Sequence, residues 1–325
     1  MGGTGGVARS SWADRVKPVR IRLEASSHCQ LRCPSCPTTT GAIDAAIGRG
    51  FLAAADFRRL VEANPRIREI ELSNYGEMFL NPELLDIIRH AHRRDVALTA
   101  DNGANLNHAA PDVLEGLVRY RFRSIRCSID GVSQQSYERY RARGRLGKVI
   151  RNIETINRHK RSLRSDFPRL TWQLVAFGHN DAEIEHARQM ATRLDMDFFV
   201  KLSWDPEFSP VRRVDAVRAQ SGTGAASRDE YRSLHGVDYM DGLCRQLWEA
   251  PQINWDGKVL GCCRNFWGDF GGNVFSHGLD NGINSEKMRY ARAMLEGRKP
   301  PRADIPCATC DIYLSRQSGK PECDE

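Results

Sequence analysis

Cysteines are the residues of this chain whose spacing points most directly to chemistry. Cys29, Cys33 and Cys36 stand in the segment CQLRCPSC, separated by three and then two residues. This spacing lets three thiolates converge from one turn-rich loop on a metal centre. A four-iron cluster has four ligand sites, so three cysteines leave one iron open to a further donor, which a reactive cluster needs. Zinc, or simply reduced thiols, are the alternative interpretations.

A second group of cysteines lies in the last third of the chain: Cys244, Cys262, Cys263, Cys307, Cys310 and Cys323. The first residues are glycine-rich and polar with no apolar signal-peptide core, so we expect a cytoplasmic protein. Thiols stay reduced in the cytosol, where clustered cysteines indicate metal binding or catalysis rather than a disulfide framework. Cys127 stands alone inside a predicted strand and is interpreted as a buried apolar residue.

A repeated alternation of strands and helices is expected to position these cysteines. The predicted strands cover residues 20–26, 67–74, 96–103, 124–131, 170–177 and 197–204. Helical patterns fall between them, including one long helical stretch over residues 136–160. Such alternation indicates parallel strands joined by helical crossovers, with ligands bound at the carboxyl ends of the strands.

The chain as a whole is expected to divide into four parts. Residues 1–18 are predicted to be a disordered lead-in, and the six strand-helix units occupy residues 19–205. Residues 206–239 are polar and irregular, as expected of a linker or a lid. Residues 240–325 form a second domain that is too small to bury much core without a staple such as a metal.

Composition narrows the range of partners. The chain has 41% hydrophobic and 27% charged residues and no run of about 20 apolar residues, so we expect no membrane partner. Its formal net charge is +7, but the basic residues are scattered among acidic ones. Basic patches interleaved with aromatic residues are absent from the sequence, so we expect no nucleic-acid partner.

The three-cysteine motif after the first strand resembles the signature of the radical S-adenosylmethionine (SAM) superfamily. The resemblance implies that the cluster is a 4Fe-4S cluster that binds SAM, and that an external reductant of flavodoxin or ferredoxin type supplies its electrons. Gly76 and Glu77 match the core of the family's Gly-Gly-Glu-Pro segment, although Tyr75 and Met78 depart from it.

The same resemblance implies further cofactor-binding residues. Ser128 and Asp130 resemble the fourth-strand segment that faces the cofactor, and Arg141 matches an arginine expected to hold its ribose or carboxylate. Ser35 replaces an aromatic residue that often packs near the adenine, so another side chain must cover the base.

The C-terminal cysteines resemble the auxiliary-cluster domain known as SPASM in its two-cluster form and as the twitch in its one-cluster form. Position 316 is Arg where a further SPASM cysteine is expected, so the resemblance implies one auxiliary 4Fe-4S cluster. Its ligands would be Cys244, Cys262, Cys307 and Cys310. A zinc site made by the same cysteines stays open. The implied fold is an α/β partial (β/α)6 TIM-like barrel followed by a small twitch/SPASM-like iron-sulfur domain.

Three reactions fit these features. In the first, a radical SAM dehydrogenase resembling the aminocyclitol dehydrogenases of antibiotic biosynthesis oxidises a secondary alcohol of a small molecule, a sugar or aminocyclitol, to a ketone. Lys201, Ser203 and Asp205 are the candidate hydroxyl or amine contacts and proton acceptors.

The second reaction is epimerisation, with a cysteine thiol returning the hydrogen atom; Cys263 is the first candidate and Cys323 the second. The third is modification of a peptide, which we expect to need a separate recognition partner because the first barrel strand begins near residue 20. The sequence leaves the substrate and the oligomeric state open.

Overall fold

Residues 15–318 are described by the computed structural model. Most of the expected lead-in over residues 1–18 lies outside the described residues, and so does Cys323. Among the described residues, no helix combines the length and apolar character needed to cross a bilayer.

One eight-stranded sheet runs through the molecule in the order β6-β5-β4-β3-β2-β1-β7-β8. Strands β1 to β6 pair in parallel, and β7 continues in parallel beside β1. The six predicted strands are therefore confirmed, as is the expected α/β partial barrel. The strands are β1 (Arg20–Leu23), β2 (Glu69–Glu71), β3 (Ala97–Ala104), β4 (Ser124–Ser128), β5 (Arg169–Ala176), β6 (Asp197–Leu202), β7 (Gln252–Ile253) and β8 (Val259–Gly261).

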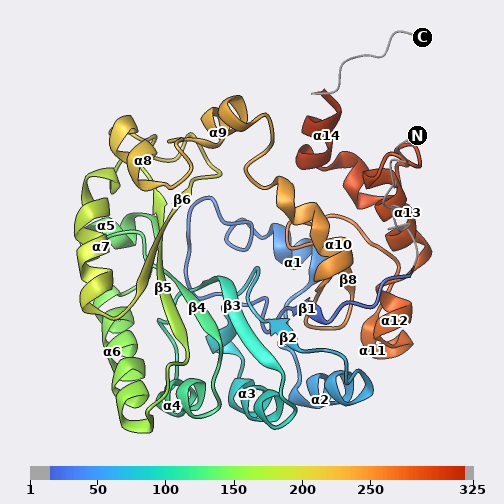
Figure 1. Cartoon of the computed structure of the whole chain (residues 1–325), viewed down its shortest axis with the longest axis horizontal. Coiled ribbons are helices and arrows are strands. Elements are labelled where there is room, and N and C mark those ends of the chain that lie inside the picture. Colours follow the sequence, from blue (N-terminus) through green and yellow to red (C-terminus); the bar gives the residue numbers. More distant parts are fainter. Residues whose placement is uncertain (1–14, 319–325) are drawn as a thin grey trace, which may run out of the picture.

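Crossover helices cover the outer face of this sheet (Figure 1). Each turns an apolar stripe inwards: Ile87 and Ile88 of α3 and Val149 and Ile153 of α6 are almost fully buried. The crossover helices are α2 (Ala54–Ala63), α3 (Leu84–Arg93), α4 (Pro111–Arg119), α5 (Gln134–Tyr140), α6 (Leu146–Leu163) and α7 (Ile184–Arg193). The carboxyl ends of the strands are left for loops, as the parallel arrangement requires.

The long helix expected over residues 136–160 is wrong, because the chain breaks between α5 and α6. Gly144 lies in the break, where an added Cβ would stand 2.6 Å from the ring of Tyr137 and 2.7 Å from the carbonyl oxygen of Arg141. Arg143 adopts a left-handed conformation, with φ of 69°. The break carries Arg141 off the helix surface and into the barrel.

The segment expected to be irregular between residues 206 and 239 contains two short helices, α8 (Val214–Gln220) and α9 (Arg228–His235). Sequence periodicity missed α9 because it buries no side chain completely. Its start carries the usual signal, since the Ser227 side chain accepts a hydrogen bond from the backbone of Glu230. Figure 1 shows both helices above the carboxyl end of β6.

The C-terminal part joins the barrel through its first strand. β7 pairs with β1, and the hairpin partner β8 is antiparallel to β7. Short helices complete this part: α10 (Gln246–Glu249), α11 (Val274–His277), α12 (Leu279–Gly282), α13 (Glu286–Leu295) and α14 (Asp311–Ser318). The C-terminal part thereby lies beside the barrel, next to β1 (Figure 1).

Candidate functional site

The first three cysteines occupy the loop that follows β1, before the short helix α1 (Ala42–Ile47). The backbone of Cys36 donates to the carbonyl of Cys33 at 3.1 Å, which closes the loop into a turn. All three side chains contact one apolar cluster built around Tyr140 and Phe177. Burial raises the pKa of the Cys29 thiol to about 12, and negative charge at Cys33 and Cys36 acts in the same direction. The three sulfurs therefore share one small region.

The turn around Gly76 is fastened to the same loop. The backbone N–H of Glu77 donates to the carbonyl of His28 at 2.7 Å, one residue before Cys29. An added Cβ at Gly76 would overlap the carbonyl oxygen of Ser26 and lie 2.7 Å from that of His28. Only glycine permits this approach, so the sequence expectation of a close backbone contact at Gly76 has a concrete cause.

Gly76→Ala is expected to destabilise the fold by about 3 kcal/mol, because its methyl group meets backbone atoms that cannot swing aside. Urea unfolding measures the change. Gly147→Ala in α6 is the matched control, since its Cβ meets only the end of the Arg151 side chain at 3.5 Å. Equal stabilities of the two variants would contradict the assigned contact.

Buried carboxylates that the sequence analysis did not single out hold the loops at the barrel mouth. Glu24 accepts hydrogen bonds from the backbone N–H groups of Tyr75 and Gly76, each at 3.1 Å. Glu71 does the same for Ser73, which follows β2, and for Asp101 within β3. The available signal was an acidic residue between apolar neighbours in a predicted strand, as Glu24 stands between Leu23 and Ala25.

Glu77, expected to bind the cofactor, is also fully buried and turned towards backbone. Its carboxylate accepts from the N–H of Asn105 at 2.7 Å and of Phe79 at 3.2 Å. Burial raises its pKa to about 7. These hydrogen bonds of the Glu77 carboxylate therefore position the loops after β2 and β3.

Replacing Glu24 by Gln is expected to flatten the fall of stability with pH. Burial raises the pKa of Glu24 from 4.5 to about 8, so the folded state binds more protons than the unfolded state between these values. Stability then decreases as the pH rises through this window, by at most about 1.4 kcal/mol per pH unit from this group.

Glu24→Gln removes the titrating carboxyl group. Its amide oxygen can keep both hydrogen bonds, because Oε1 of Glu24 already accepts from the backbone N–H groups of Tyr75 and Gly76. Urea unfolding across pH 4.5 to about 8 compares the slopes of the two proteins. Identical slopes would show that Glu24 does not carry the raised pKa.

Arg141 and Asp130 form a buried ion pair. Nε of Arg141 lies 2.6 Å from Oδ2 of Asp130, whose other oxygen accepts from the N–H of Val175 at 2.7 Å. Nη1 of Arg141 lies 3.9 Å from the sulfur of Cys33. Asp130 therefore orients the arginine, and the arginine faces the cysteine loop.

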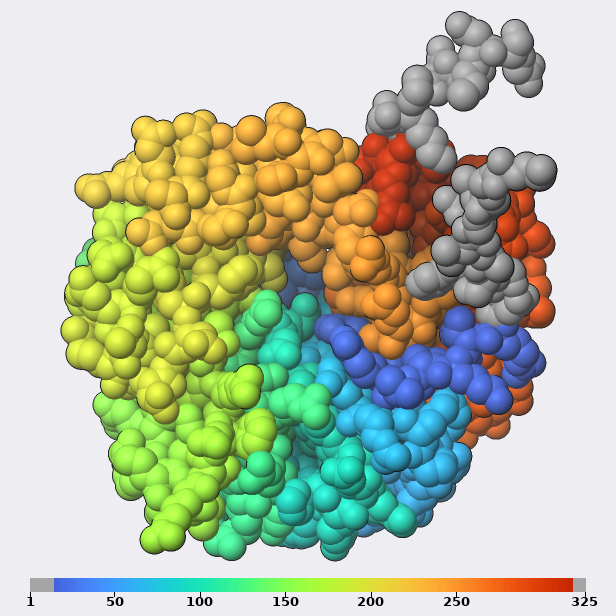
Figure 2. All heavy atoms as spheres, in the orientation of Figure 1, coloured from blue at the N-terminus to red at the C-terminus, as the bar shows by residue number. Residues whose placement is uncertain are grey.

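A cavity of about 190 Å³ brings most of the expected cofactor-binding residues together. Its lining includes the three loop cysteines, Arg141 directly after α5, and residues in or just after the barrel strands: Gly76, Glu77, Ser128, Gln173, Lys201 and Trp204. Figure 2 shows the surface hollowed near its centre, where blue N-terminal residues are visible between teal and orange segments. Asp130 is not among the lining residues and acts through Arg141.

The polar atoms of this cavity fit a bound organic cofactor. Nδ2 of Asn74 and Oε1 of Gln173 are buried and have no hydrogen-bond partner among the described residues. Buried polar atoms are normally paired, so a donor and an acceptor left open in one cavity favour a polar ligand there. Three thiols in the same lining supply the soft ligands that an iron-sulfur cluster requires.

The second group of cysteines gathers beside the barrel. Burial raises the pKa of Cys307 well above its usual value, and negative charge at Cys262, Cys244 and Cys310 adds to the effect. The backbone of Cys310 donates to the carbonyl of Cys307 at 3.2 Å. Within residues 15–318, however, no three His, Cys, Asp or Glu side chains are close enough to hold one metal ion, so both cysteine groups are more open than a single-ion site.

Comparison with known proteins gives this arrangement a context. Residues 244–311 match the SPASM family, described as an iron-sulfur cluster-binding domain. Streptococcus suis SuiB bound to S-adenosylmethionine is 13% identical, with a TM-score of 0.63 over 91% of this chain and 71% of SuiB. Native anSMEcpe with bound AdoMet is also 13% identical, with a TM-score of 0.59 over 90% of this chain and 86% of that one.

The chain has the radical SAM fold with a C-terminal SPASM domain. At these identities the structural likeness shows the fold, and the expected fold class is confirmed. BtrN in complex with AdoMet and 2-DOIA is 11% identical with a TM-score of 0.48, covering 94% of this chain and 98% of BtrN. No protein of curated function matches the sequence.

Arg316 stands beside the cysteines of the SPASM domain. It forms an ion pair with Asp241 and donates to the Asp241 carbonyl at 2.7 Å. Its positive charge lowers the pKa of Cys244, although burial dominates and raises that pKa to about 11. The residue that replaces an expected cysteine therefore favours the thiolate form of a neighbouring candidate ligand.

Cys263 is nearly buried, with 9% of its surface accessible to solvent. Nε2 of Gln246 lies 3.5 Å from its sulfur, and the Cys263 N–H donates to Oε1 of the same glutamine at 2.8 Å. Burial raises the pKa of Tyr75 and lowers that of Lys201, and a negative charge on Cys263 acts on both groups in the upward direction. The thiol is therefore within electrostatic reach of the barrel mouth.

The candidates at the end of β6 have different surroundings. Asp205 accepts hydrogen bonds from Ser35 and from the backbone of Glu207 and Phe208, and Ser203 bonds to the backbone of Asp205. These two residues are engaged in local loop contacts. Lys201 lines the cavity, and burial lowers its pKa to about 8.

Proposed function

We propose that this protein is a radical SAM oxidoreductase that oxidises a secondary alcohol of a sugar or aminocyclitol to a ketone, with the auxiliary cluster as electron acceptor. The observation that carries the radical SAM assignment is the single cavity shared by Cys29, Cys33, Cys36 and the carboxyl ends of the barrel strands. Antibiotic biosynthesis is the setting we propose for such a substrate.

When bound, the first cluster supplies the electron that splits SAM into methionine and a 5'-deoxyadenosyl radical, and the auxiliary cluster accepts the electron released by alcohol oxidation. The chain's own residues bind and orient the cofactor. Asn74 and Gln173 offer an open donor and an open acceptor, and Arg141 offers positive charge for the cofactor's carboxylate or ribose. Trp204, which lines the same cavity, is the candidate aromatic cover in place of Ser35.

Lys201 is the proposed proton acceptor. Burial, and then the positive charge of Arg228, lower its pKa to about 8, so part of the side chain is neutral near neutral pH. Removal of a hydrogen atom from the carbinol carbon makes the hydroxyl proton acidic, and Nζ takes that proton as the ketone forms. Asp205 and Ser203 are less suited, because loop contacts occupy them.

Epimerisation is the second candidate, and the position of Cys263 favours it. Its thiol is nearly buried, is held by Gln246 and is electrostatically linked to Lys201. In this reaction the thiol returns a hydrogen atom to the substrate carbon, which requires Cys263 to reach the cavity that Lys201 lines. Peptide modification remains the third candidate; SuiB, which shares the fold at 13% identity, has been solved bound to the precursor peptide SuiA.

Deuterium at the carbinol carbon of candidate sugars and cyclitols tests the proposal. With reconstituted protein, SAM and reductant, we expect about one deuterium in 5'-deoxyadenosine per ketone formed. Mass spectrometry of both products measures this ratio. If the reaction in heavy water instead gives an unoxidised product with solvent deuterium at that carbon, the enzyme is an epimerase and the dehydrogenase proposal is wrong.

A further inference from the structure

A larger cavity of about 530 Å³ adjoins the first one. It is lined by the loop after β6, by the start of α9 and by residues of the SPASM domain, including Arg264 and Asp311. Trp204 lines both cavities, so they meet at this side chain. A molecule in the larger cavity can therefore extend towards the cofactor-binding cavity.

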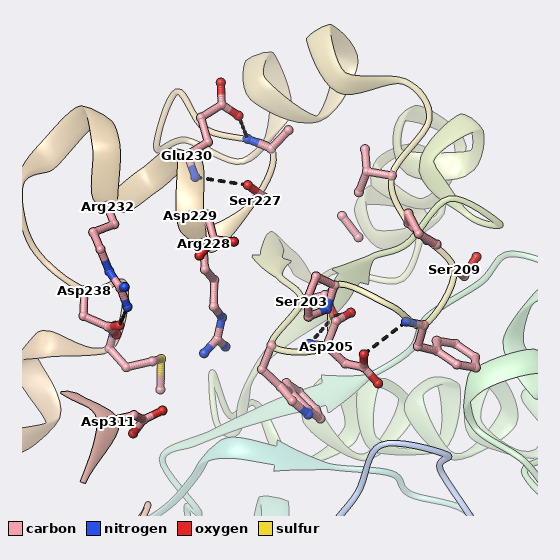
Figure 3. A pocket seen from close by; sticks show the side chains of 18 of the residues that line it. Ser203, Asp205, Ser209, Ser227, Arg228, Asp229, Glu230, Arg232, Asp238 and Asp311 are labelled. Carbon is pink, nitrogen blue, oxygen red and sulfur yellow. Dashed lines mark hydrogen bonds and ion pairs between the residues drawn. The ribbon is translucent and has the colours of Figure 1, made fainter. Parts of the chain in front are cut away.

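Three arginines line this larger cavity together with Asp205, Asp229, Glu230, Asp238 and Asp311, and two of the arginines are paired with the last two of these acids. Arg232 lies 2.7 Å from Asp238, and Arg264 forms an ion pair with Asp311. Arg228 has no acid within ion-pair distance among the described residues; Asp238 and Asp311 act on it only from farther away. Figure 3 shows the Arg232–Asp238 pair at one wall and the Arg228 side chain extending into the open space.

The local contacts of Arg228 orient it without neutralising it. Nε donates to the carbonyl of Leu202 at 3.3 Å, and the guanidinium lies 5.0 Å from the ring centre of Tyr239. The two terminal nitrogens have no hydrogen-bond partner among the residues that the structure describes. A planar guanidinium fixed in this way presents two parallel donors, which match the oxygens of a carboxylate or phosphate.

We propose that Arg228 binds an anionic substituent, a carboxylate or a phosphate, of the substrate in the larger cavity. This inference rests on the proposed function and narrows its substrate class to alcohols that carry negative charge. Burial lowers the pKa of Arg228, and its charge also lowers the pKa of Lys201. An anion between the two side chains offsets the burial of the Arg228 charge and its repulsion of Lys201. An aminocyclitol that carries amines but no acidic group does not.

Position supports a role in orientation. Arg228 contacts the carbonyl of Leu202, the last residue of β6, and Lys201 immediately precedes it. An anion bound at Arg228 therefore directs the rest of the substrate past Trp204 towards Lys201 and the first cavity. The substrate carbon to be attacked lies on the side opposite the anionic group.

Ligand-observed NMR titrations of the anaerobically reconstituted protein with SAM test the site. The probes are benzoate, phenyl phosphate and the neutral analogue benzamide. Arg228→Gln is compared with Arg232→Gln, which changes an arginine of the same helix and the same cavity that is already paired. Iron content and SAM cleavage without substrate, measured on the same samples, show separately whether the radical SAM assignment holds.

We expect at least one anion to bind the wild type and Arg232→Gln, with affinity at least tenfold weaker in Arg228→Gln, and benzamide to bind weakly to all three. Preference for benzoate or for phenyl phosphate identifies the anionic group. The proposal is overturned if neither anion binds the wild type, if Arg228→Gln binds them equally well, or if benzamide binds as tightly as benzoate.

Discussion

Replacing Cys29, Cys33 and Cys36 together by Ala is expected to abolish SAM cleavage and to lower the iron content from about eight to about four per chain. The reason is that these three side chains are the thiols of the cofactor-binding cavity, and the other candidate ligands belong to the SPASM domain. Iron and sulfide analysis, with chromatography of 5'-deoxyadenosine, measures both effects on protein reconstituted without oxygen.

Cys127→Ala is the control for this experiment. Cys127 is fully buried in β4, packs in the main hydrophobic core and is not among the residues that line the cofactor-binding cavity. Its replacement should leave iron content and cleavage unchanged while costing some stability. Retained SAM cleavage in the triple variant would remove the radical SAM assignment.

The barrel could be predicted from the sequence because each unit repeats a local pattern. A short apolar strand followed by an amphipathic helix specifies a parallel crossover wherever it occurs, and six such units appear in order. The cysteine motif and Gly76 were recognisable for the same reason, since their chemistry depends on short sequence spacing. Arg141 was matched through the family resemblance, but its place inside the barrel required the structure, because it depends on a helix break at Gly144.

Features built from distant residues could not be predicted. Glu24 and Gly76 are 52 positions apart, yet the carboxylate of one fixes the backbone of the other. Nothing local marks this pairing, which arises when β1 and β2 become neighbours. Arg228 was missed because its signal is the lack of an acidic partner, and that is visible only after the other arginines of the cavity have found theirs.

The roles of the loop candidates also depended on the folded context. Asp205 was a reasonable proton acceptor by residue type, but Ser35 and two backbone groups occupy its carboxylate. Lys201 stays in the cavity lining with a pKa lowered to about 8. Burial thus separates two residues that the sequence treated as equivalent.

Cys262→Ala is expected to lose the auxiliary cluster and Cys263→Ala to keep it, although the two residues are adjacent. Burial, and then negative charge at Cys262, Cys244 and Cys310, raise the pKa of Cys307, whereas Gln246 contacts the sulfur of the neighbouring Cys263. Cys262→Ala should lose about four irons and stop ketone formation, yet keep SAM cleavage without substrate. It should also lower the melting temperature, because a small domain loses its metal staple.

Cys263→Ala should keep about eight irons, and its products then decide between the first two reactions. If the substrate is oxidised, the variant still forms the ketone, because electron transfer needs the cluster and not this thiol. If the substrate is epimerised, product formation stops while iron content and SAM cleavage persist, because the hydrogen donor is gone. Loss of iron from Cys263→Ala but not from Cys262→Ala would reverse the ligand assignment, and zinc at the wild-type auxiliary site would remove its role as electron acceptor.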